Sequence, residues 1–589
     1  MKNKIIKNHL LTLISLFCFI LQLSVQGVVY VNKNATGANN GNSWADAYTT
    51  IQAGIDDADF ANEEVWVTQE TYLEAIVIKS GVKLYGGFNG TETELNQRNW
   101  ATNVTTIDGS TARGGLPAYH VVIMESITNA TIDGFTITGG EAIGGGTNDY
   151  GGGIFCYYSS PAISNNTISG NSANAGGGIS CWNSSPVITN NTISGNSASG
   201  GGGIYCDAPS SPVITNNTIS GNSANYYGGG GIFCDKNSSP VITNNIISGN
   251  SVSEHGGGIY CYWSSPQITN NTISGNSASD RGGGICCWYN SSPEITNNTI
   301  SGNSTINYGG GIYCSNNSSP AISNNTIAGN SVTNKGGGIF CYSYSSPQIT
   351  NNTISGNSAG YGGGIYCWSN SSPNIKNTIF YNNNKYDIYE YDLSSDPIVS
   401  YNDFYGNPDG VYYDEGTIPY TSVAAMDSAI AECSNNIGLN PLFVGDTLSG
   451  GSWTAAPVYN AATFQTTLTN SSAVWTENEH AGRILNPDTT QNLQFVIIDN
   501  TATTMMVWGD ITTIAQSGDA YKIFDYHLQI ASPCIDAGYD QNVPNIDFDG
   551  EPRPMDVLGI DNNGPLAEYD IGADEYKVTP ADTVWEFYR

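Results

Sequence analysis

The sequence predicts an all-β protein: a right-handed parallel β-helix (solenoid) with an N-terminal helical cap and a small β-rich insertion near the C-terminus. The first observation is that segment 151–384 repeats one pattern nine times, GGGI-x-C, a short loop, SSP-x-I-x-NN and TISGNS, every 25 to 28 residues. This period is too short for a domain, so each unit must bury its apolar face against its neighbours. The second observation is that each unit lacks helix formers and carries three short stretches rich in β-branched residues, which predicts three strands and three turns per coil.

Alternation along each strand predicts which side chains point inward. Ile204 and Cys206 are two residues apart and are expected inside, with Tyr205 between them outside. Stacking the coils then places nine thiols in one internal column, those of Cys156, Cys181, Cys206, Cys234, Cys261, Cys287, Cys314, Cys341 and Cys367. We interpret them as small buried hydrophobic groups, with a metal or redox site as the alternative. Cys286 is expected to be the one solvent-reachable thiol of the repeats.

The Asn-Asn pair of each repeat is predicted to lie at a tight bend. Asparagine tolerates the left-handed conformation that such a bend needs, and its amide can bond the equivalent Asn one coil away. Isoleucine columns on the strands before and after this bend complete the expected interior.

The N-terminus has the pattern of a secretory signal, assigned to residues 1–27. Lys2, Lys4 and Lys7 precede an apolar run from Leu10 to Leu23. A membrane anchor is the alternative, but polar sequence follows at once, so we expect no transmembrane segment in the mature chain. This predicts an extracellular or cell-surface location, associated with the outer membrane.

The flanks of the repeats are predicted to close the solenoid. Residues 28–150 are expected to hold the N-terminal cap and first coils, with an amphipathic helix in 48–60 because Ile51, Ile55 and Ala58 share one face. The remaining segments are degenerate coils (385–446), a β-rich insertion (447–525), a C-terminal β-helix-ending module (526–576) and a tail (577–589). Cys433 and Cys534 could pair in an oxidising compartment.

The net charge of −33 comes mostly from outside the regular repeats. An acidic exported protein is a poor candidate for binding nucleic acid or an anionic membrane. We expect no cofactor; calcium is the alternative, because five acids cluster near the C-terminus without the spacing of a calcium loop. They are Asp547, Asp549, Asp556, Asp561 and Asp570.

Several motifs resemble a known family. The start (Val29-Tyr30-Val31, Thr50-Ile51-Gln52-Ala53) resembles bacterial secreted right-handed β-helix proteins, and the GGGI and ISGN repeats resemble polymorphic outer-membrane proteins. The C-terminal stretches Ser532-Pro533-Cys534-Ile535-Asp536 and Asp570-Ile571-Gly572-Ala573-Asp574 are similar to the choice-of-anchor Q module. The resemblance implies a surface protein, usually without enzymatic activity.

The outward positions of the Gly-Ile-x-Cys strand carry two rows of aromatic rings. We expect both rows to be exposed, the first including Phe155, Tyr205, Phe233, Tyr260, Tyr313, Phe340 and Tyr366. The second row gives the candidate ligand-binding residues Tyr157, Trp182, Tyr262, Trp288, Tyr342 and Trp368. Aromatic faces stack on the C–H faces of sugars, which favours a glycan or another cell-surface polymer as partner. The alternatives are that the rings only stabilise the sheet, or that the C-terminal module covers them.

The favoured function is therefore an adhesin-like protein with an extended binding face. A polysaccharide lyase or glycoside hydrolase is one alternative, and a structural surface-layer or spacer protein is another. Catalysis would need an ionisable cluster, and Glu254, His255, Asp280 and Arg281 fall in the same turn of adjacent coils. A solvated turn with an incidental ion pair explains these residues as well, and the regularity of the repeats argues against an active site within them.

Overall fold

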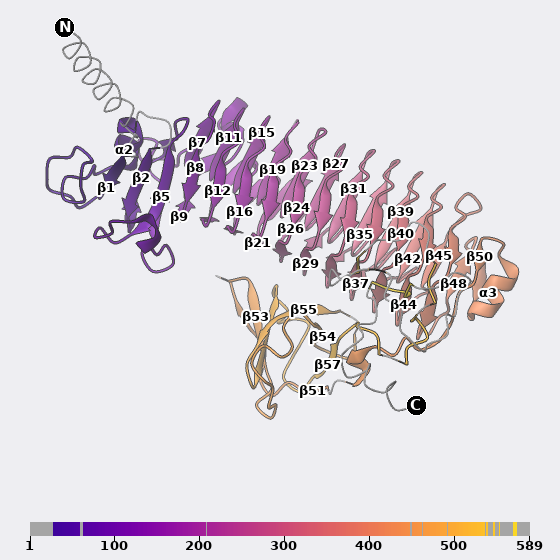
Figure 1. Ribbon diagram of the computed structural model, residues 1–589. Helices are drawn as coiled ribbons and strands as arrows, with labels where there is room; N and C mark the ends of the chain where they lie inside the picture. Colours follow the sequence, from indigo (N-terminus) through magenta and orange to yellow (C-terminus); the bar gives the residue numbers. More distant parts are fainter. Residues whose placement is uncertain are drawn as a thin grey trace, which may run out of the picture.

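The computed structural model describes most of the chain. The described residues are 27–58, 63–207, 209–447, 450–461, 463–491, 493–529, 531–535, 537–539, 546–547, 553 and 569–573. They form a long right-handed β-helix, beneath which the C-terminal part of the chain folds back (Figure 1). The expected signal segment and Asp549, Asp556 and Asp561 lie outside the described residues. Among the residues described, no helix is long and apolar enough to cross a membrane.

Four sheets run along the β-helix, parallel except where β49 (Ile418–Tyr420) joins β48 (Tyr412–Asp414) antiparallel at the far end, and we name them by their sequence motifs. The Pro-Ile sheet has fifteen strands, from β1 (Val28–Val31) to β50 (Cys433–Ser434). The Thr-Ile sheet has thirteen, from β3 (Glu70–Tyr72) to β47 (Asp403–Tyr405). The Ile-Cys sheet has fourteen, from β4 (Ile76–Val77) to β49 (Ile418–Tyr420). The prediction of three strands per coil is wrong for most repeats, because a fourth, Ser-Ala sheet of eight short strands runs from β10 (Glu141–Ala142) to β38 (Ser331–Val332).

One coil shows how the motifs become strands. It consists of β15 (Ile179–Trp182), β16 (Val187–Thr189), β17 (Thr192–Ser194) and β18 (Ser197–Gly200). Each strand pairs in register with its counterpart one repeat later, so Ile179 faces Ile204 and Cys181 faces Cys206. Because the motifs are in register, inward isoleucines stack on isoleucines and inward cysteines on cysteines, as in this pair of coils.

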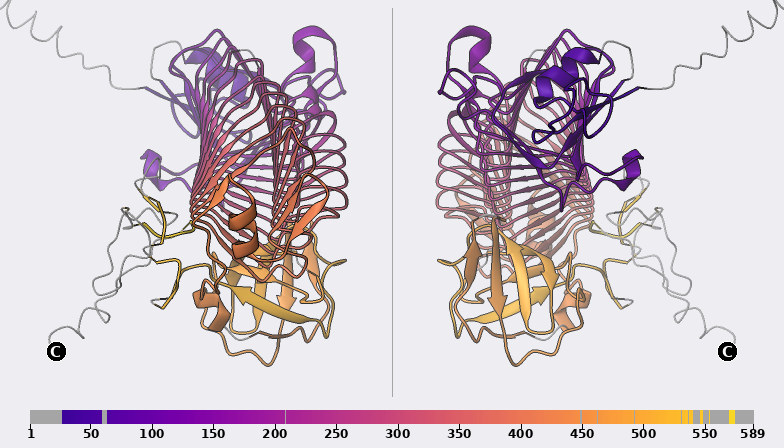
Figure 2. Two further views of the ribbon diagram at one scale, coloured as in Figure 1. Left: turned by 90° about the vertical axis from the view of Figure 1, so that its right-hand side faces the viewer. Right: turned by 90° about the vertical axis from the view of Figure 1, so that its left-hand side faces the viewer.

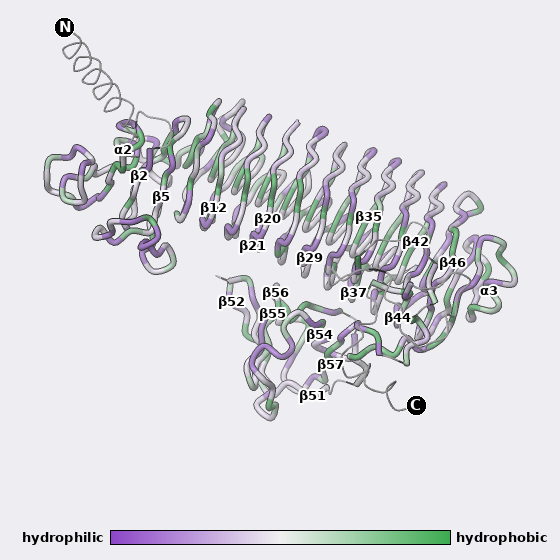
Figure 3. The backbone as a smooth tube through the Cα atoms, viewed as in Figure 1, coloured by the Kyte–Doolittle hydropathy of each residue, from purple (hydrophilic) through white to green (hydrophobic). Residues whose placement is uncertain are grey.

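The interior is a continuous apolar column. The nine repeat cysteines and the inward-pointing isoleucines stacked with them, such as Ile163, Ile168 and Ile179, are fully buried in one cluster that extends from Val29 to Cys433. Figure 3 shows these residues as green bands along the inner side of the coils. The inward position of the cysteines is thus confirmed, and burial raises the pKa of the Cys314 thiol, which favours an unreactive packing role. Cys433 and Cys534 are both free, so their predicted pairing is wrong; the Cys534 thiol instead donates to Asp403 Oδ2 at 3.3 Å.

Two asparagine ladders hold the coils together. In each Asn-Asn pair the first residue takes the left-handed conformation, as Asn190 does with φ 55°. The second bonds its equivalent one coil away: Asn191 Nδ2 donates to Asn217 Oδ1 at 3.0 Å. The prediction for these pairs is confirmed: the first Asn adopts the left-handed conformation of the bend, and the second Asn forms the bond to the next coil. A second ladder, formed by the Asn of Gly-Asn-Ser, includes the bond from Asn196 Nδ2 to Asn222 Oδ1 at 3.0 Å.

The glycine triplets are needed because neighbouring coils approach closely. A Cβ on Gly202 would lie 2.4 Å from the carbonyl oxygen of Ser223 in the next coil. No side chain larger than hydrogen fits there without moving the backbone.

Helices close both ends of the apolar column. The predicted N-terminal cap is α2 (Ile51–Asp57), in which Ile51 and Ile55 are buried and Thr50 Oγ1 accepts the N-cap bond from the Ala53 N–H. At the far end, α3 (Val423–Ala429) inserts Met426 into the core. This second cap was not anticipated from the sequence, because only Met426 of its apolar residues is buried.

The C-terminal unit is a seven-stranded antiparallel sheet with its own core. Its strands are β51 (Gly451–Ser452), β52 (Val458–Asn460), β53 (Gln465–Thr469), β54 (Ile484–Asn486), β55 (Phe495–Asn500), β56 (Thr504–Trp508) and β57 (Ala520–Phe524). The unit lies against the Thr-Ile sheet, where Tyr526 Oη and Ser355 Oγ are 2.7 Å apart. The end-on views of Figure 2 show it on one side of the coils. The Ile-Cys sheet lies on another face, so the strands of this unit, Gly451 to Phe524, do not cover the aromatic rows.

Candidate functional site

The first aromatic row of the Ile-Cys sheet is buried, which corrects the expectation that both rows are exposed. Tyr205, Phe233, Tyr260, Tyr313, Phe340 and Tyr366 form a second apolar cluster on the outer side of the sheet. Turn residues such as Tyr150 and Tyr308, together with the second row, pack over it. Cys286 belongs to this cluster and is fully buried, so it is not the solvent-reachable thiol that was expected. Burial also raises the pKa of its thiol.

The second aromatic row is half-buried and forms the outer surface of that cluster. Its members are Tyr157, Trp182, Tyr262, Trp288, Tyr342 and Trp368. Neighbouring rings touch, as Tyr342 and Trp368 do with centroids 4.9 Å apart. Contacts between rings of neighbouring strands therefore account for part of the aromatic content, in agreement with the alternative that the rings stabilise the sheet.

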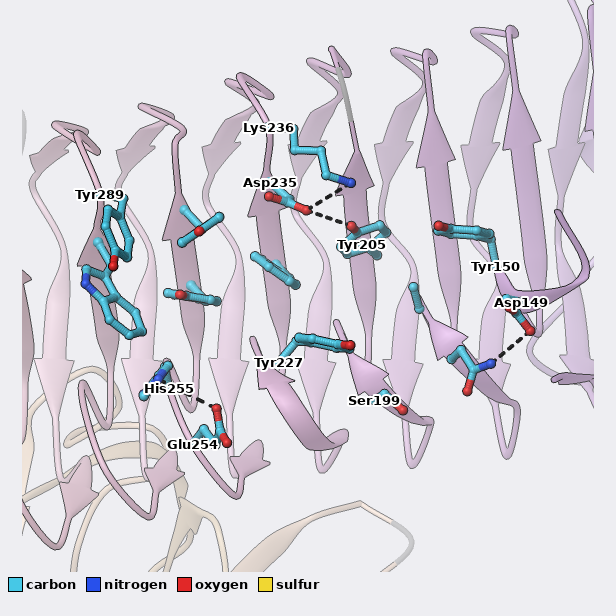
Figure 4. A pocket seen from close by; sticks show the side chains of 17 residues that line it. Asp149, Tyr150, Ser199, Tyr205, Tyr227, Asp235, Lys236, Glu254, His255 and Tyr289 are labelled. Atoms are coloured by element: carbon cyan, nitrogen blue, oxygen red, sulfur yellow. Dashed lines mark hydrogen bonds and ion pairs between the residues drawn. The ribbon is translucent and has the colours of Figure 1, made fainter. Parts of the chain in front are cut away.

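The row is interrupted where two successive repeats carry aspartate in place of an aromatic residue. These are Asp207, at the end of β19 (Ile204–Asp207), and Asp235, at the end of β23 (Ile232–Asp235). A groove of about 950 Å³ opens at this point (Figure 4). Its floor is formed by Tyr205, Phe233 and Tyr260.

The groove combines aromatic and polar walls. Tyr150 stands at one end, and Tyr262, Trp288 and Tyr289 stand at the other. The side wall is built by the turns before the glycine triplets, which contribute Asp149, Ser199, Tyr227, Glu254 and His255. A groove of this size with an apolar floor and a few convergent polar groups is typical of a ligand-binding site.

Two buried carboxylates share one lysine at the groove, which Asp235 and Lys236 line. Lys236 Nζ lies 3.2 Å from Asp207 Oδ1 and 3.6 Å from Asp235 Oδ2, and Tyr205 Oη donates to Asp235 Oδ2 at 2.8 Å. Burial raises the pKa of Asp235, an effect opposed by the bond from Tyr205 and by the charge of Lys236. For Lys236, burial acts to lower the pKa, but the nearby carboxylates outweigh it and the pKa is raised. The lysine is therefore charged at neutral pH.

The four candidate catalytic residues are brought together, two of them on the groove wall. His255 Nε2 lies 3.7 Å from Glu254 Oε2, and His255 Nδ1 lies 3.8 Å from Asp280 Oδ2. Arg281 Nε is 3.3 Å from Asp280 Oδ2, and its guanidinium lies over the Trp288 ring at 4.8 Å. Glu254 and His255 line the groove. Burial, together with the positive charge of Arg281, lowers the pKa of His255 to about 4, so its imidazole is neutral at neutral pH.

Sequence reasoning missed Asp207, Asp235 and Lys236 as site residues. The signal was present, since these repeats break the aromatic pattern after the cysteine in two successive coils. The depth of the groove could not be deduced from it, because that depth depends on the turns that build the opposite wall.

Comparisons with known proteins agree with this architecture. The family model described as right-handed β-helix region matches residues 95–273, and that of the periplasmic copper-binding protein NosD matches residues 229–434. No curated protein matches the chain.

Three solved structures illustrate the similar folds. A complex of XylC with xylose is 10% identical, covers 84% of this chain and 100% of its own, and has a TM-score of 0.38. The Dettilon tailspike protein is 14% identical, with coverages of 85% and 94% and a TM-score of 0.37. Pectate lyase Pel9A is 14% identical, with coverages of 94% and 98% and a TM-score of 0.33. These similarities concern the overall β-helix.

Proposed function

We propose that this protein binds a polysaccharide in the groove of the Ile-Cys sheet, in an adhesin-like role. The observation that carries the proposal is that the aromatic row opens at Asp207 and Asp235 into a groove with an aromatic floor. Sugar rings offer apolar C–H faces to aromatic rings and hydroxyl groups to carboxylates and lysine. The groove provides both kinds of partner side by side.

The charges in the groove favour a neutral or amine-bearing glycan. Asp149, Asp235 and Glu254 line the groove together with one lysine, Asp207 pairs with that lysine, and His255 is neutral. A uronic acid polymer would bring further negative charge to this excess of carboxylates, which is unfavourable in a partly desolvated groove. We therefore propose a ligand without carboxylate groups.

Two tryptophans at the same position of their repeats provide a matched test. Trp288 lines the groove, and Trp368 lies three coils further along the same row. Binding of hexasaccharides of xylose, glucose, glucosamine and galacturonic acid would be measured by calorimetry. Trp288→Ala should weaken binding by about tenfold or more, and Trp368→Ala by less than about twofold. Unchanged affinity in the Trp288 variant, or binding of the galacturonic acid oligomer alone, would contradict the proposal.

Cleavage of the bound glycan is a second candidate function. It is favoured by the proximity of Asp207 and Asp235 to one lysine and by the raised pKa of Asp235, because glycoside hydrolysis uses one protonated and one ionised carboxyl group. In this scheme Asp235 would give its proton to the glycosidic oxygen as the bond from that oxygen to the sugar carbon breaks, and water would add to the same carbon and pass its proton to the ionised carboxylate of the pair. The same hexasaccharides would be incubated with the protein and with an Asp235→Asn variant. Absence of shorter products with the unmodified protein excludes this candidate.

No metal-dependent step is proposed. Within the described part of the chain, no group of three or more His, Cys, Asp and Glu side chains is arranged to hold a metal ion. The calcium alternative rests on five acids, of which only Asp547 and Asp570 are described, and both are buried.

We also propose that the protein is exported and displayed at the cell surface. The signal-like N-terminus and the C-terminal stretches similar to choice-of-anchor Q support this location, and the matched NosD family is described as periplasmic. Antibody labelling of intact cells, compared with permeabilised cells, tests it. Labelling only after permeabilisation would contradict surface display.

A further inference from the structure

The turn that follows each Ile-Cys strand places residues in the left-handed conformation. Asn183 occupies this turn in one repeat with φ 48°. In other repeats a bulky aromatic residue takes nearly the same backbone angle: Tyr158 has φ 48° and Trp263 has φ 53°. Asparagine is tolerated there because its short polar side chain can bond locally, whereas a bulky residue is strained. The backbone geometry is thus common to the repeats, and the aromatic residues are the unfavourable choice for it.

Packing does not explain the strained aromatic residues near the groove. Trp263 retains 45% of its surface exposed and Tyr289, which has φ 53° in the next coil, retains 36%. A residue that is both strained and exposed gains little stability from its own contacts. Strain of this kind often marks a functional position, but Tyr158 and Tyr344 share it, so the location beside the groove is what distinguishes Trp263 and Tyr289.

The two rings extend the aromatic end of the groove outward. Trp263 and Tyr289 are parallel within 1°, with centroids 6.0 Å apart on adjacent coils. Tyr289 lines the groove and stacks on Trp288, with centroids 5.2 Å apart. Figure 4 shows Tyr289 at the end of the groove opposite Tyr150. A polysaccharide that leaves the groove at this end would pass over these rings.

We propose that Trp263 and Tyr289 form a stacking subsite for a sugar ring of the bound polysaccharide, just outside the groove. The inference rests on the proposed function and adds a further contact between the protein and the polysaccharide. The parallel rings present exposed aromatic surface to the apolar face of a pyranose. Their strained turns are kept because they place this surface beside the groove, where the Asn of sibling repeats would offer none.

Replacing the aromatic residue with asparagine separates stability from binding. Trp263→Asn should leave thermal stability unchanged or raise the melting temperature by about 1–2 °C, because Asn suits the left-handed turn. The same change should weaken binding of the hexasaccharide preferred by the unmodified protein by about fivefold to tenfold. Trp263→Tyr, which keeps a ring at this position, should retain most of the affinity.

Tyr344 is the control. It lies in the corresponding turn two coils beyond Tyr289, one residue further along that turn, with φ 61° and 61% of its surface exposed. Tyr344→Asn should change stability in the same direction and leave binding unchanged. Unaltered affinity in Trp263→Asn, or an equal loss in Tyr344→Asn, overturns the subsite while the groove proposal stands. Failure of the unmodified protein to bind any of the hexasaccharides overturns both.

Discussion

Removing one rung of an asparagine ladder should loosen the coils on either side of it. Asn271 is almost fully buried, and its Nδ2 donates to Asn298 Oδ1 at 3.0 Å and to Ile242 O at 2.9 Å. Its Oδ1 accepts from the Asn245 backbone N–H at 2.9 Å and from Asn245 Nδ2 at 3.0 Å. Asn271→Ala removes all of these bonds and leaves the Asn245 N–H buried without its acceptor.

The magnitude follows from these groups. One orphaned buried donor costs about 1–3 kcal/mol, and the net loss of about two further bonds adds roughly 1 kcal/mol each, which gives about 3–5 kcal/mol. Asn270 provides the control, because its side chain is exposed and its role is to adopt the left-handed backbone conformation of the bend, with φ 57°. Asn270→Ala should cost only about 1 kcal/mol, since alanine tolerates that conformation less well.

Native-state hydrogen exchange is the suitable assay, because coils of a solenoid open locally. Peptides from the coils around residue 271 should exchange about 100-fold to 4,000-fold faster in Asn271→Ala, since 1.4 kcal/mol corresponds to a factor of ten. Coils near the N-terminal cap should be unaffected. If Asn271→Ala accelerates exchange no more than Asn270→Ala does, the ladder does not stabilise the stack and the reasoning is refuted.

Three further predictions concern charge. His255, with its pKa lowered to about 4, binds fewer protons in the folded than in the unfolded protein, so the free energy of unfolding should fall by about 3 kcal/mol as pH falls from about 6.5 to about 4. Denaturant unfolding of His255→Gln should lack this loss. An identical pH profile in the variant would contradict the prediction. Burial raises the pKa of Asp387 to about 8, so its contribution should fall as pH rises from about 4 to about 8, and Asp387→Asn should unfold at higher denaturant than the unmodified protein at pH 8. Lys236→Met frees Asp207 and Asp235 of their shared cation and should strengthen calorimetric binding of the glucosamine hexamer by about fivefold; weaker binding would indicate that the lysine itself contacts the sugar.

Much of the β-helix could be predicted because the repeat determines it locally. Alternation alone places Cys206 inside, and the chemistry of asparagine alone predicts the bend at Asn190. The Ser-Ala strands were missed because they are short, only two residues in β26 (Ser251–Val252) and β30 (Ser277–Ala278), and carry little apolar alternation. The burial of Tyr205 was missed for a different reason, since it depends on turn residues such as Tyr150 that pack over the sheet from other coils.

The site was predicted less well than the fold, and the reason lies in the regularity of the array. Identical repeats produce identical surfaces, so a groove can arise only where one repeat differs. Cys206 and Cys234 are 28 residues apart, whereas Cys181 and Cys206 are 25 apart.

Two of the three additional residues lengthen β22 (Ser223–Gly228), where the pairing register shifts between Ala198 and Gly200 and Tyr227 joins the groove wall. The same two coils carry Asp207 and Asp235 in place of aromatic residues. Two departures from the repeat thus lie at the same place on the surface. The longer β22 contributes to the groove wall, and the two aspartates replace the aromatic residues that would cover the groove floor. Regularity argues against a site within most of the array, and by the same argument this irregular coil is where binding is expected.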